Sequence, residues 1–322
     1  LCILSFAILS ACGTDSAVPS SDKKNKPQKV SFVDSIPNFN SDSAFSFVQK
    51  QVDFGPRVPN SISHKQCGNW IEKQLKNFGC TVLLQEGTYN AHDKKELVFK
   101  NIFASLNPDN QKRILITAHW DTRPWADNDS DSKFHNTPID GANDGASGVA
   151  VILELARVIG MQNWDIGVDF LLFDIEDYGI SSEHNSFCYG SQYWKNHITY
   201  DKARPRFGIN LDMVGDKNAY FSYEGFSNQY ARHVLDKVWS SAHELGHKKI
   251  FSRKITYPVT DDHLYVNQAG IPCIDIIHRD HYSGQFPKTW HTHDDQIENI
   301  SPKMLQKVGQ TLLLTALKES KL

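Results

Sequence analysis

Apolar runs of strand length recur along this chain, and stretches with helical spacing separate them. Continuous apolar runs are typical of strands that are covered on both faces, as in parallel sheets. The pattern predicts strands within residues 81–85, 97–106, 113–118, 168–174, 207–215 and 271–277. We expect these strands to form the centre of the fold.

Helices are expected between and after these strands. Apolar residues recur at helical spacing in residues 64–79, 145–160, 230–246 and 301–319. Ser301 and Pro302 suit the N-cap and the first position of the last helix, and Gly79 suits the end of the first. The alternation predicts an α/β fold: a single domain with a central, largely parallel β-sheet flanked by helices on both faces.

The N-terminus lacks both patterns. Residues 1–12, LCILSFAILSAC, are an apolar run too short to span a bilayer, and small residues precede Cys12. An ordinary secretory signal would explain this run, but LSAC followed by Gly13 is similar to the lipobox of bacterial lipoproteins. We therefore expect an N-terminally truncated lipoprotein signal over residues 1–11. The protein would be exported and anchored through a lipid on Cys12 to the periplasmic face of the inner or outer membrane.

The residues that follow Cys12 do not have the composition of a packed core. The stretch GTDSAVPSSDKKNKPQK is rich in Ser, Pro, Lys and Asp, which is typical of flexible linkers. We expect a tether over residues 12–42 and the folded α/β domain, which carries any catalytic site, over residues 43–322.

Composition and cysteine spacing exclude two classes of function. The 322 residues carry a formal net charge of −3 and no basic stripe, which argues against nucleic-acid binding. Apart from Cys2 and Cys12, the cysteines are Cys67, Cys80, Cys188 and Cys273, and no C-x-x-C spacing occurs, so a cysteine zinc site is not expected. Disulfides and free buried thiols both stay open.

Polar residues gather where the predicted strands end. Ligands of such sheets bind beyond the carboxyl ends of the strands. Five separate segments place metal-competent side chains at that edge, namely His119, Asp144, the pair Glu176 and Asp177, Asp212, and His291. A His/Asp/Glu set without cysteine suits catalytic zinc with an open position for water or substrate.

Each of these residues also has a structural explanation. Asp144, in the turn DGANDGASG, is of a type that forms turns and caps helices, and Asp212 precedes a turn at Gly215. His119 would only form a structural hydrogen bond to Asp121. His291, one of 14 histidines, would be an ordinary surface histidine. The coincidence of five segments at one sheet edge favours the metal site over five independent structural roles.

The motifs AHWD, DGANDGASG, FDIEDYG, NLDMVG and WHTHDD occur in this order between about residues 114 and 295. As a set they resemble the zinc-dependent exopeptidase family, which contains both co-catalytic aminopeptidases and the animal-type (type II) glutaminyl cyclases. The segment WDTRPWADND also resembles bacterial lipoprotein members of the cyclase branch. The resemblance implies a mixed central sheet flanked by helices, in agreement with the pattern above.

The cyclase branch implies one zinc ion, with Asp144, Asp177 and His291 as its ligands. Its implied reaction converts the N-terminal Gln of peptides and proteins to pyroglutamate with release of ammonia, so the expected partners are peptide or protein N-termini that bear Gln. No nucleic acid is expected as a partner, and the sequence allows no further protein partner to be inferred.

The same resemblance gives roles to acids and tryptophans around the metal. Glu176 would carry the proton, while Asp212 and Asp261 would be catalytic acids beside it. Trp290 and Trp120 would contact the substrate. The aminopeptidase branch binds two zinc ions instead, and His119 and Asp212 would then hold the second metal.

Several features separate the two branches. Trp290 directly before His291, the segment TDDHLYVNQAGIPCIDII at 260–277 and the tail WHTHDDQIENIS resemble the cyclases. Asp177 stands where a second Glu is expected, and NLDMVG is closer to the aminopeptidases. We expect a glutaminyl-peptide cyclotransferase, and keep a di-zinc aminopeptidase as the alternative. A binding lipoprotein with a decayed site is disfavoured because every expected ligand is present.

Overall fold

The computed structural model describes residues 32–322 except 184, 199, 201–202 and 281–282. The predicted signal, the lipidated Cys12 and most of the tether lie outside the described residues. Contacts group Phe32–Leu322 into one unit, and its first α-helix, α1, Ser41–Val52, begins just before the boundary expected at residue 43. Within this part of the chain, no helix has both the length and the apolar composition needed to cross a membrane.

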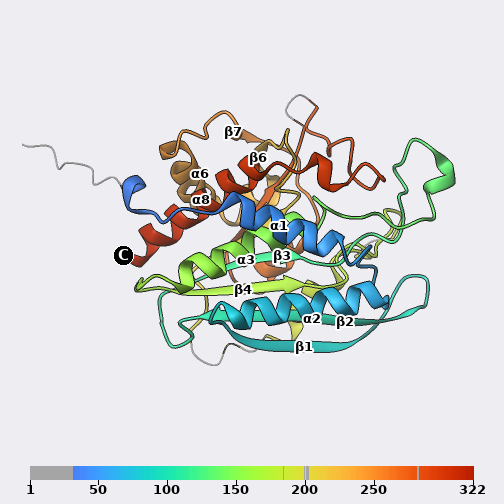
Figure 1. Cartoon of the computed structure of the whole chain (residues 1–322), viewed down its shortest axis with the longest axis horizontal. Coiled ribbons are helices and arrows are strands. Elements are labelled where there is room, and N and C mark those ends of the chain that lie inside the picture. Colours follow the sequence, from blue (N-terminus) through green and yellow to red (C-terminus); the bar gives the residue numbers. More distant parts are fainter. Residues whose placement is uncertain (1–31, 184, 199, 201–202, 281–282) are drawn as a thin grey trace, which may run out of the picture. The chain divides into compact units, whose positions relative to one another are not determined.

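A six-stranded sheet forms the centre of the fold, in the order β1-β2-β4-β3-β5-β8 (Figure 1). Its strands are β1 Thr81–Asn90, β2 Glu96–Leu106, β3 Arg113–His119, β4 Gly167–Phe173, β5 Gly208–Asp212 and β8 Cys273–Ile277. The four strands β4, β3, β5 and β8 run parallel to one another, while β2 is antiparallel to both of its neighbours, β1 and β4. The prediction of a mixed, mostly parallel sheet is confirmed.

Helices cover both faces of the sheet because buried side chains point both ways along the central strands. Ile114, Ile116 and Ala118 of β3 join the larger core with α1, α2, α3, α6 and α8, whereas Leu115 joins a second core with α4 and α7. The helices are α2 Ile62–Asn77, α3 Ala146–Gly160, α4 Tyr189–Asn196, α5 Gly225–Tyr230, α6 Arg232–Glu244, α7 Asp262–Gln268 and α8 Pro302–Ser320.

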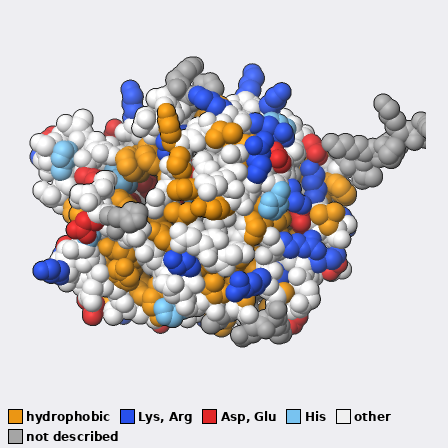
Figure 2. Space-filling view, turned by 180° about the vertical axis from the view of Figure 1, so that it is seen from behind, with side chains coloured by type: hydrophobic (Ala, Val, Ile, Leu, Met, Phe, Trp, Pro, Cys, Tyr) orange, Lys and Arg blue, Asp and Glu red, His pale blue; other side chains and the backbone are white. Residues whose placement is uncertain are grey.

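Two short strands and three 3₁₀ turns complete the described chain. The strands β6 Phe221–Tyr223 and β7 Phe251–Ile255 pair with each other. The turns are η1 Val33–Ser35, η2 Ser132–Phe134 and η3 Ile297–Asn299. On the face shown in Figure 2, basic side chains are interspersed with acidic, histidine and apolar ones, in agreement with the absence of a basic stripe from the sequence.

The parallel strands bring the predicted site residues to one edge. His119 of β3 is level with Phe173 of β4, so the acids that follow β4 lie beside it. Asp212 of β5 is level with Ile277 of β8 at the same end of the sheet. The ends of these strands and the loops at this edge carry every metal-competent residue singled out above.

Candidate metal centre and active-site cavity

The glycine-rich turn before α3 holds Asp144 in place. The two carboxylate oxygens of Asp295 accept the backbone N–H groups of Asn143, at 2.7 Å, and Asp144, at 3.0 Å. Gly145 has a φ of 91° and a Cβ there would lie 2.9 Å from the carbonyl oxygen of Asp121, so the close approach requires glycine. The second Asp of WHTHDD thus positions a metal-competent residue more than a hundred positions away in the sequence.

The acid pair after β4 is held in the same manner. The carboxylate of Asp121 accepts the backbone N–H groups of Glu176, at 3.0 Å, and Asp177, at 3.2 Å. Ile175, directly before the pair, has a φ of 49°, which costs a β-branched residue about 1–3 kcal/mol. His291 has a φ of 55° as well. Both of these positions belong to the site, because Ile175 precedes the acid pair and His291 is a predicted metal ligand.

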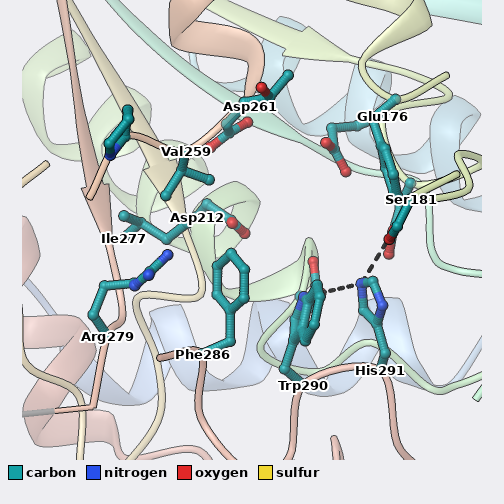
Figure 3. Close-up of a pocket in the computed structure, with 15 residues that line it drawn as sticks. Glu176, Ser181, Asp212, Val259, Asp261, Ile277, Arg279, Phe286, Trp290 and His291 are labelled. Atoms are coloured by element: carbon teal, nitrogen blue, oxygen red, sulfur yellow. Dashed lines mark ion pairs between the residues drawn. The ribbon is translucent and has the colours of Figure 1, made fainter. Parts of the chain in front are cut away.

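Asp144, Asp177 and His291 form a buried group whose ligand atoms all lie within 4.8 Å of one another. His291 Nε2 lies 3.3 Å from Asp177 Oδ1 and 3.8 Å from Asp144 Oδ2 (Figure 3). Asp177 Oδ2 is buried without a hydrogen-bond partner. An orphaned buried carboxylate oxygen beside a histidine and a second carboxylate fits zinc with one position left open.

Two further residues brace this group and were not anticipated from the sequence. Arg123 donates to Asp177 Oδ1 at 3.1 Å and forms two 2.7 Å hydrogen bonds with Asp127. Asp127 Oδ1 in turn lies 3.4 Å from His291 Nδ1. Arg123 therefore connects two predicted metal ligands, one directly and one through Asp127, and holds the short arm of Asp177 in position.

These partners set the protonation of the metal group. Burial opposes the charged form of His291, but the charge of Asp177 and the hydrogen bond with Asp127 outweigh it and raise the pKa of His291 to about 8. Burial acts against ionisation of Asp177, yet His291 and Arg123 lower the pKa of its carboxyl below the usual value. Below about pH 8, a metal ion must displace a proton from His291.

A second group shares Asp144 with the first. His119 Nε2 lies 3.0 Å from Asp144 Oδ1 and 3.4 Å from Asp212 Oδ1. The ligand atoms of these three residues all lie within 4.8 Å of one another, close enough to share a metal ion. Both ring nitrogens of His119 are buried without a well-aligned hydrogen bond. The residues for a second metal are therefore together, and their identity alone does not separate the two branches.

Glu176 lies among other acids beside the metal group (Figure 3). Burial, together with the charges of Asp177 and Asp261, raises the pKa of Glu176 well above its usual value. Burial and the charge of Asp144 raise the pKa of Asp212 to about 7. The thiol of Cys188 donates to Glu176 Oε1 at 3.1 Å, so one carboxylate oxygen is fixed in orientation. A carboxyl of raised pKa at this place is suited to take up and release a proton.

The groups open into a cavity of about 340 Å³. Asp144, Glu176, Asp177, Asp212 and Asp261 line one part of it, as expected from the sequence. Its other lining residues come mainly from loops and include Ser181, Phe187, Val259, Arg279, Phe286 and Trp290. The acids thus face an aromatic wall, and Figure 3 shows Phe286 and Trp290 rising together beside His291.

The aromatic wall is a continuous stack. The ring of Phe286 stacks on Trp290 at 4.2 Å between centroids, and Trp290 stacks on His291 at 3.8 Å. Trp290 therefore lies at the cavity where the sequence placed it. Phe286 was not anticipated, because nothing in the loop around it repeats with a recognisable period.

Trp120 lies elsewhere. Its side chain is 1% exposed, stacks on His64 at 4.3 Å and donates to the carbonyl oxygen of Lys100 at 3.0 Å. It lines a separate cavity of about 470 Å³ and is not among the described residues that line the metal-centre cavity. The position of Trp120 gives no support to the substrate contact expected from the sequence.

All four cysteines within the described ranges are buried and free, Cys67, Cys80, Cys188 and Cys273. Of the two possibilities left open by their spacing, the structure has free thiols. Cys188, whose thiol donates to Glu176, is the one among these four that belongs to a group close enough to hold a metal ion, together with Glu176 and Asp261.

Comparisons with known proteins agree with this geometry. A crystal structure of Bacteroides thetaiotaomicron glutaminyl cyclase bound to N-acetylhistamine is 45% identical in sequence, with a TM-score of 0.84 over 88% of this chain and 99% of that one. A Zn-dependent exopeptidase from Parabacteroides distasonis is 44% identical, with a TM-score of 0.85 over 88% of this chain and 99% of that one. Both matches extend across nearly all of the described chain.

A further relative is more distant. Aminopeptidase YwaD of Bacillus subtilis (strain 168) is 31% identical over 271 residues, which is 81% of this chain. This chain spans about half of the length of that aminopeptidase, 53%. The sequence model described as peptidase family M28 matches residues 101–316, the range that contains all the strand-end acids and histidines of the cavity. The resemblance to the zinc exopeptidases is confirmed, and the chain belongs to peptidase family M28.

Proposed function

We propose that this protein is a glutaminyl-peptide cyclotransferase, which converts the N-terminal Gln of peptides or proteins to pyroglutamate and releases ammonia. The observation that carries the proposal is the stack of Phe286 and Trp290 against His291, which walls the cavity directly beside the metal group. A compact aromatic wall suits a reaction in which one small side chain must fold back on its own amine. The 45% identical glutaminyl cyclase of Bacteroides thetaiotaomicron supports the same reaction.

The proposed cofactor is a single zinc ion held by Asp144, Asp177 and His291. When bound, zinc supplies a Lewis acid that polarises the γ-carbonyl of the substrate glutamine. The similarity to a Zn-dependent exopeptidase and the fit of the donor set support zinc over harder cations, which prefer sites built from oxygen ligands alone.

Glu176 is the proposed proton carrier. The substrate amine attacks the γ-carbonyl carbon, the new C–N bond closes the five-membered ring, and the bond to the side-chain amide nitrogen breaks. Glu176 accepts the proton that the attacking amine loses and gives it to the departing nitrogen, which leaves as ammonia. The raised pKa of Glu176 suits both transfers near neutral pH.

Asp212 and Asp261 are assigned to support this carrier. Asp261 groups with Glu176 and Cys188 within 4.8 Å, and Asp261 Oδ2 accepts a hydrogen bond from Asn210 at 2.9 Å. Negative charge on Asp261 contributes to the raised pKa of Glu176. Trp290 is assigned to substrate contact through its place in the stacked wall.

A di-zinc aminopeptidase is the second candidate, and one observation favours it. His119, Asp144 and Asp212 are close enough to hold a second metal ion. Glu176 would then activate a water molecule for attack on the first peptide bond. The 31% identity to aminopeptidase YwaD is compatible with this reaction.

We also propose that the protein is an exported lipoprotein, held at the periplasmic face of the inner or outer membrane through Cys12. The apolar run of residues 1–11 and the LSAC sequence support this location. Radiolabelled palmitate should be incorporated into the full-length protein in a bacterial host. A C12S variant should not incorporate it, and equal labelling of the two would exclude this anchor.

Product analysis separates the two candidate reactions. The zinc-loaded protein is incubated with a Gln-initiated peptide amide, and the products are analysed by mass spectrometry. Loss of one ammonia from an otherwise intact peptide is the expected result. Free glutamine together with the shortened peptide would establish the aminopeptidase instead.

A further inference from the structure

A buried arginine lines the cavity beyond the aromatic wall. Arg279 follows the end of β8 and is only 6% exposed, yet its side chain borders the same cavity as the metal group. Figure 3 shows Arg279 beside Ile277 and Phe286, on the opposite side of the view from Glu176 and His291. It is the one lysine or arginine among the described residues that line this cavity.

The guanidinium of Arg279 is fixed before any ligand binds. It lies over the ring of Phe286 at 4.4 Å from the ring centroid, and its Nε donates to the carbonyl oxygen of Gly284 at 2.8 Å. Phe286 is itself stacked on Trp290, and Trp290 on His291. Arg279 is therefore the outer end of a row of planar groups that begins at a predicted metal ligand.

The positive charge of Arg279 is only partly compensated. Among the described residues, no carboxylate forms an ion pair with it, in contrast to the buried Arg113 and Arg123, which pair with Asp169 and Asp127. Burial lowers the pKa of Arg279, and the charges of Asp275 and Glu224 offset this only in part. A buried cation without a paired anion costs stability, so it is expected to have a ligand.

We propose that Arg279 binds a carboxylate on the residue that follows the N-terminal glutamine of the substrate. The inference rests on the proposed cyclase function, because it places the glutamine between the metal group and Trp290 and the next residue beyond it, toward Phe286 and Arg279. Two sources can supply the carboxylate: an acidic side chain at the second position, or the C-terminal carboxylate of a dipeptide. A planar guanidinium held on a ring face presents its remaining N–H groups to both oxygens of such a group.

The test compares peptides that differ only in charge. Gln-Glu-amide is compared with Gln-Gln-amide for the side chain, and Gln-Ala with Gln-Ala-amide for the C-terminus. The wild-type protein should favour the charged member of at least one pair in kcat/KM by about tenfold, the value of one charge-assisted hydrogen bond. The pair that shows the preference identifies the source of the carboxylate.

Variants assign the preference to Arg279. In R279Q the ratio between charged and neutral peptides should fall to about one, and R279K should retain part of it because lysine keeps the charge but loses the fork geometry. R253Q is the matched control, since Arg253 is exposed and contacts Ser240 and Asp236 away from the cavity. The control should keep the wild-type ratio. A wild-type ratio near one, or an equal ratio in R279Q, would overturn the proposal.

A binding measurement keeps this test independent of turnover. Calorimetry with the E176Q variant should give a lower Kd for the charged member of the preferred pair, and the difference should vanish in E176Q/R279Q. Equal Kd values for both members would overturn the role of Arg279 even if the protein is a cyclase. Absence of ammonia from every peptide would instead contradict the proposed function, and the Kd comparison would still decide the role of Arg279.

Discussion

The two sides of the cavity are built by different means. The acidic side contains Glu176 and Asp177 directly after β4 and Asp212 at the end of β5, whose positions follow from the register of a parallel sheet. It also contains Asp144 and Asp261, which directly precede α3 and α7. The opposite side consists of Phe286, Trp290 and Arg279, which come from the chain after β8. The sheet therefore places the proton carrier Glu176 and the metal ligand Asp177, while loops place His291 and the groups that select the substrate.

The two sides also differ in how their charges are compensated. On the acidic side, Asp177 is paired with Arg123, while Glu176 and Asp212 keep raised pKa values beside other acids. On the loop side, Arg279 is a buried cation stacked on a ring. Changes on the acidic side should therefore affect kcat or metal binding, and changes on the loop side should affect substrate selection.

The largest effect is expected from loss of the proton carrier. E176Q should lower kcat by about 10²–10⁴-fold, because general acid–base catalysis contributes that much, while the bound zinc per chain is unchanged. Metal analysis and ammonia release measure the two quantities separately. E183Q, at an exposed glutamate in the following loop, is the control and should keep full activity. Near-normal turnover in E176Q would remove Glu176 as the carrier.

The next effect tests the aromatic wall. W290A should lower kcat/KM for Gln peptides by roughly 10²-fold, because the reacting groups lose their folded geometry. The metal ligand His291 remains in W290A, so zinc should still bind. W164A is the control, because Trp164 packs on the main core outside the cavity. The W164A protein that folds should keep the wild-type KM. A W290A protein with unaltered kcat/KM would show that the stack does not touch the substrate.

A smaller effect is expected where only the brace of the metal group is removed. D127A leaves Asp144, Asp177 and His291 in place but takes away the partner of His291 Nδ1. The affinity for zinc should fall about 10–100-fold, as for other residues that orient metal ligands. Competition with a chelator of known affinity measures it, and D131A, at a half-exposed aspartate nearby, provides the comparison. Equal affinities in D127A and wild type would argue against the brace.

The mildest test changes only the pH. The pKa of His291 is raised to about 8 in the metal-free protein, so His291 is mostly protonated below that pH. The proton on its ring then competes with the metal ion for the ligand nitrogen. Zinc affinity should therefore rise by roughly tenfold per pH unit up to about pH 8 and then level off. A pH-independent affinity between pH 6 and about 8 would contradict the assignment of His291 as a ligand.

The acidic side of the cavity was predictable from sequence, whereas on the loop side only Trp290 was. Strand ends follow from apolar runs, and parallel strands bring those ends together, so Asp177 and Asp212 were placed without coordinates. The glycine-rich turn before a predicted helix placed Asp144. Phe286 and Arg279 lie in an irregular segment whose path no periodicity indicates. Arg123 and Asp127 are spaced four apart, but that spacing alone does not reveal that they connect two metal ligands.

Two other differences have clear physical causes. Trp120 directly follows His119, and successive side chains along an extended chain point to opposite faces, so Trp120 turns away from the metal group beside which His119 lies. The helix α1 begins within a stretch of Ser, Asp and Asn that has the composition of a tether. The side chain of Asn40 caps it by accepting the N–H groups of Asp42 and Ser43, and its apolar face is buried against α3.

The central claim is that one zinc ion and Glu176 suffice for cyclisation. The most direct measurement titrates the metal-free protein with zinc and follows ammonia release from Gln-Ala-amide. The account predicts that activity rises until about one zinc is bound per chain and then stays constant, with no free glutamine formed. Activity that continues to rise to a second equivalent, together with release of free glutamine, would contradict it.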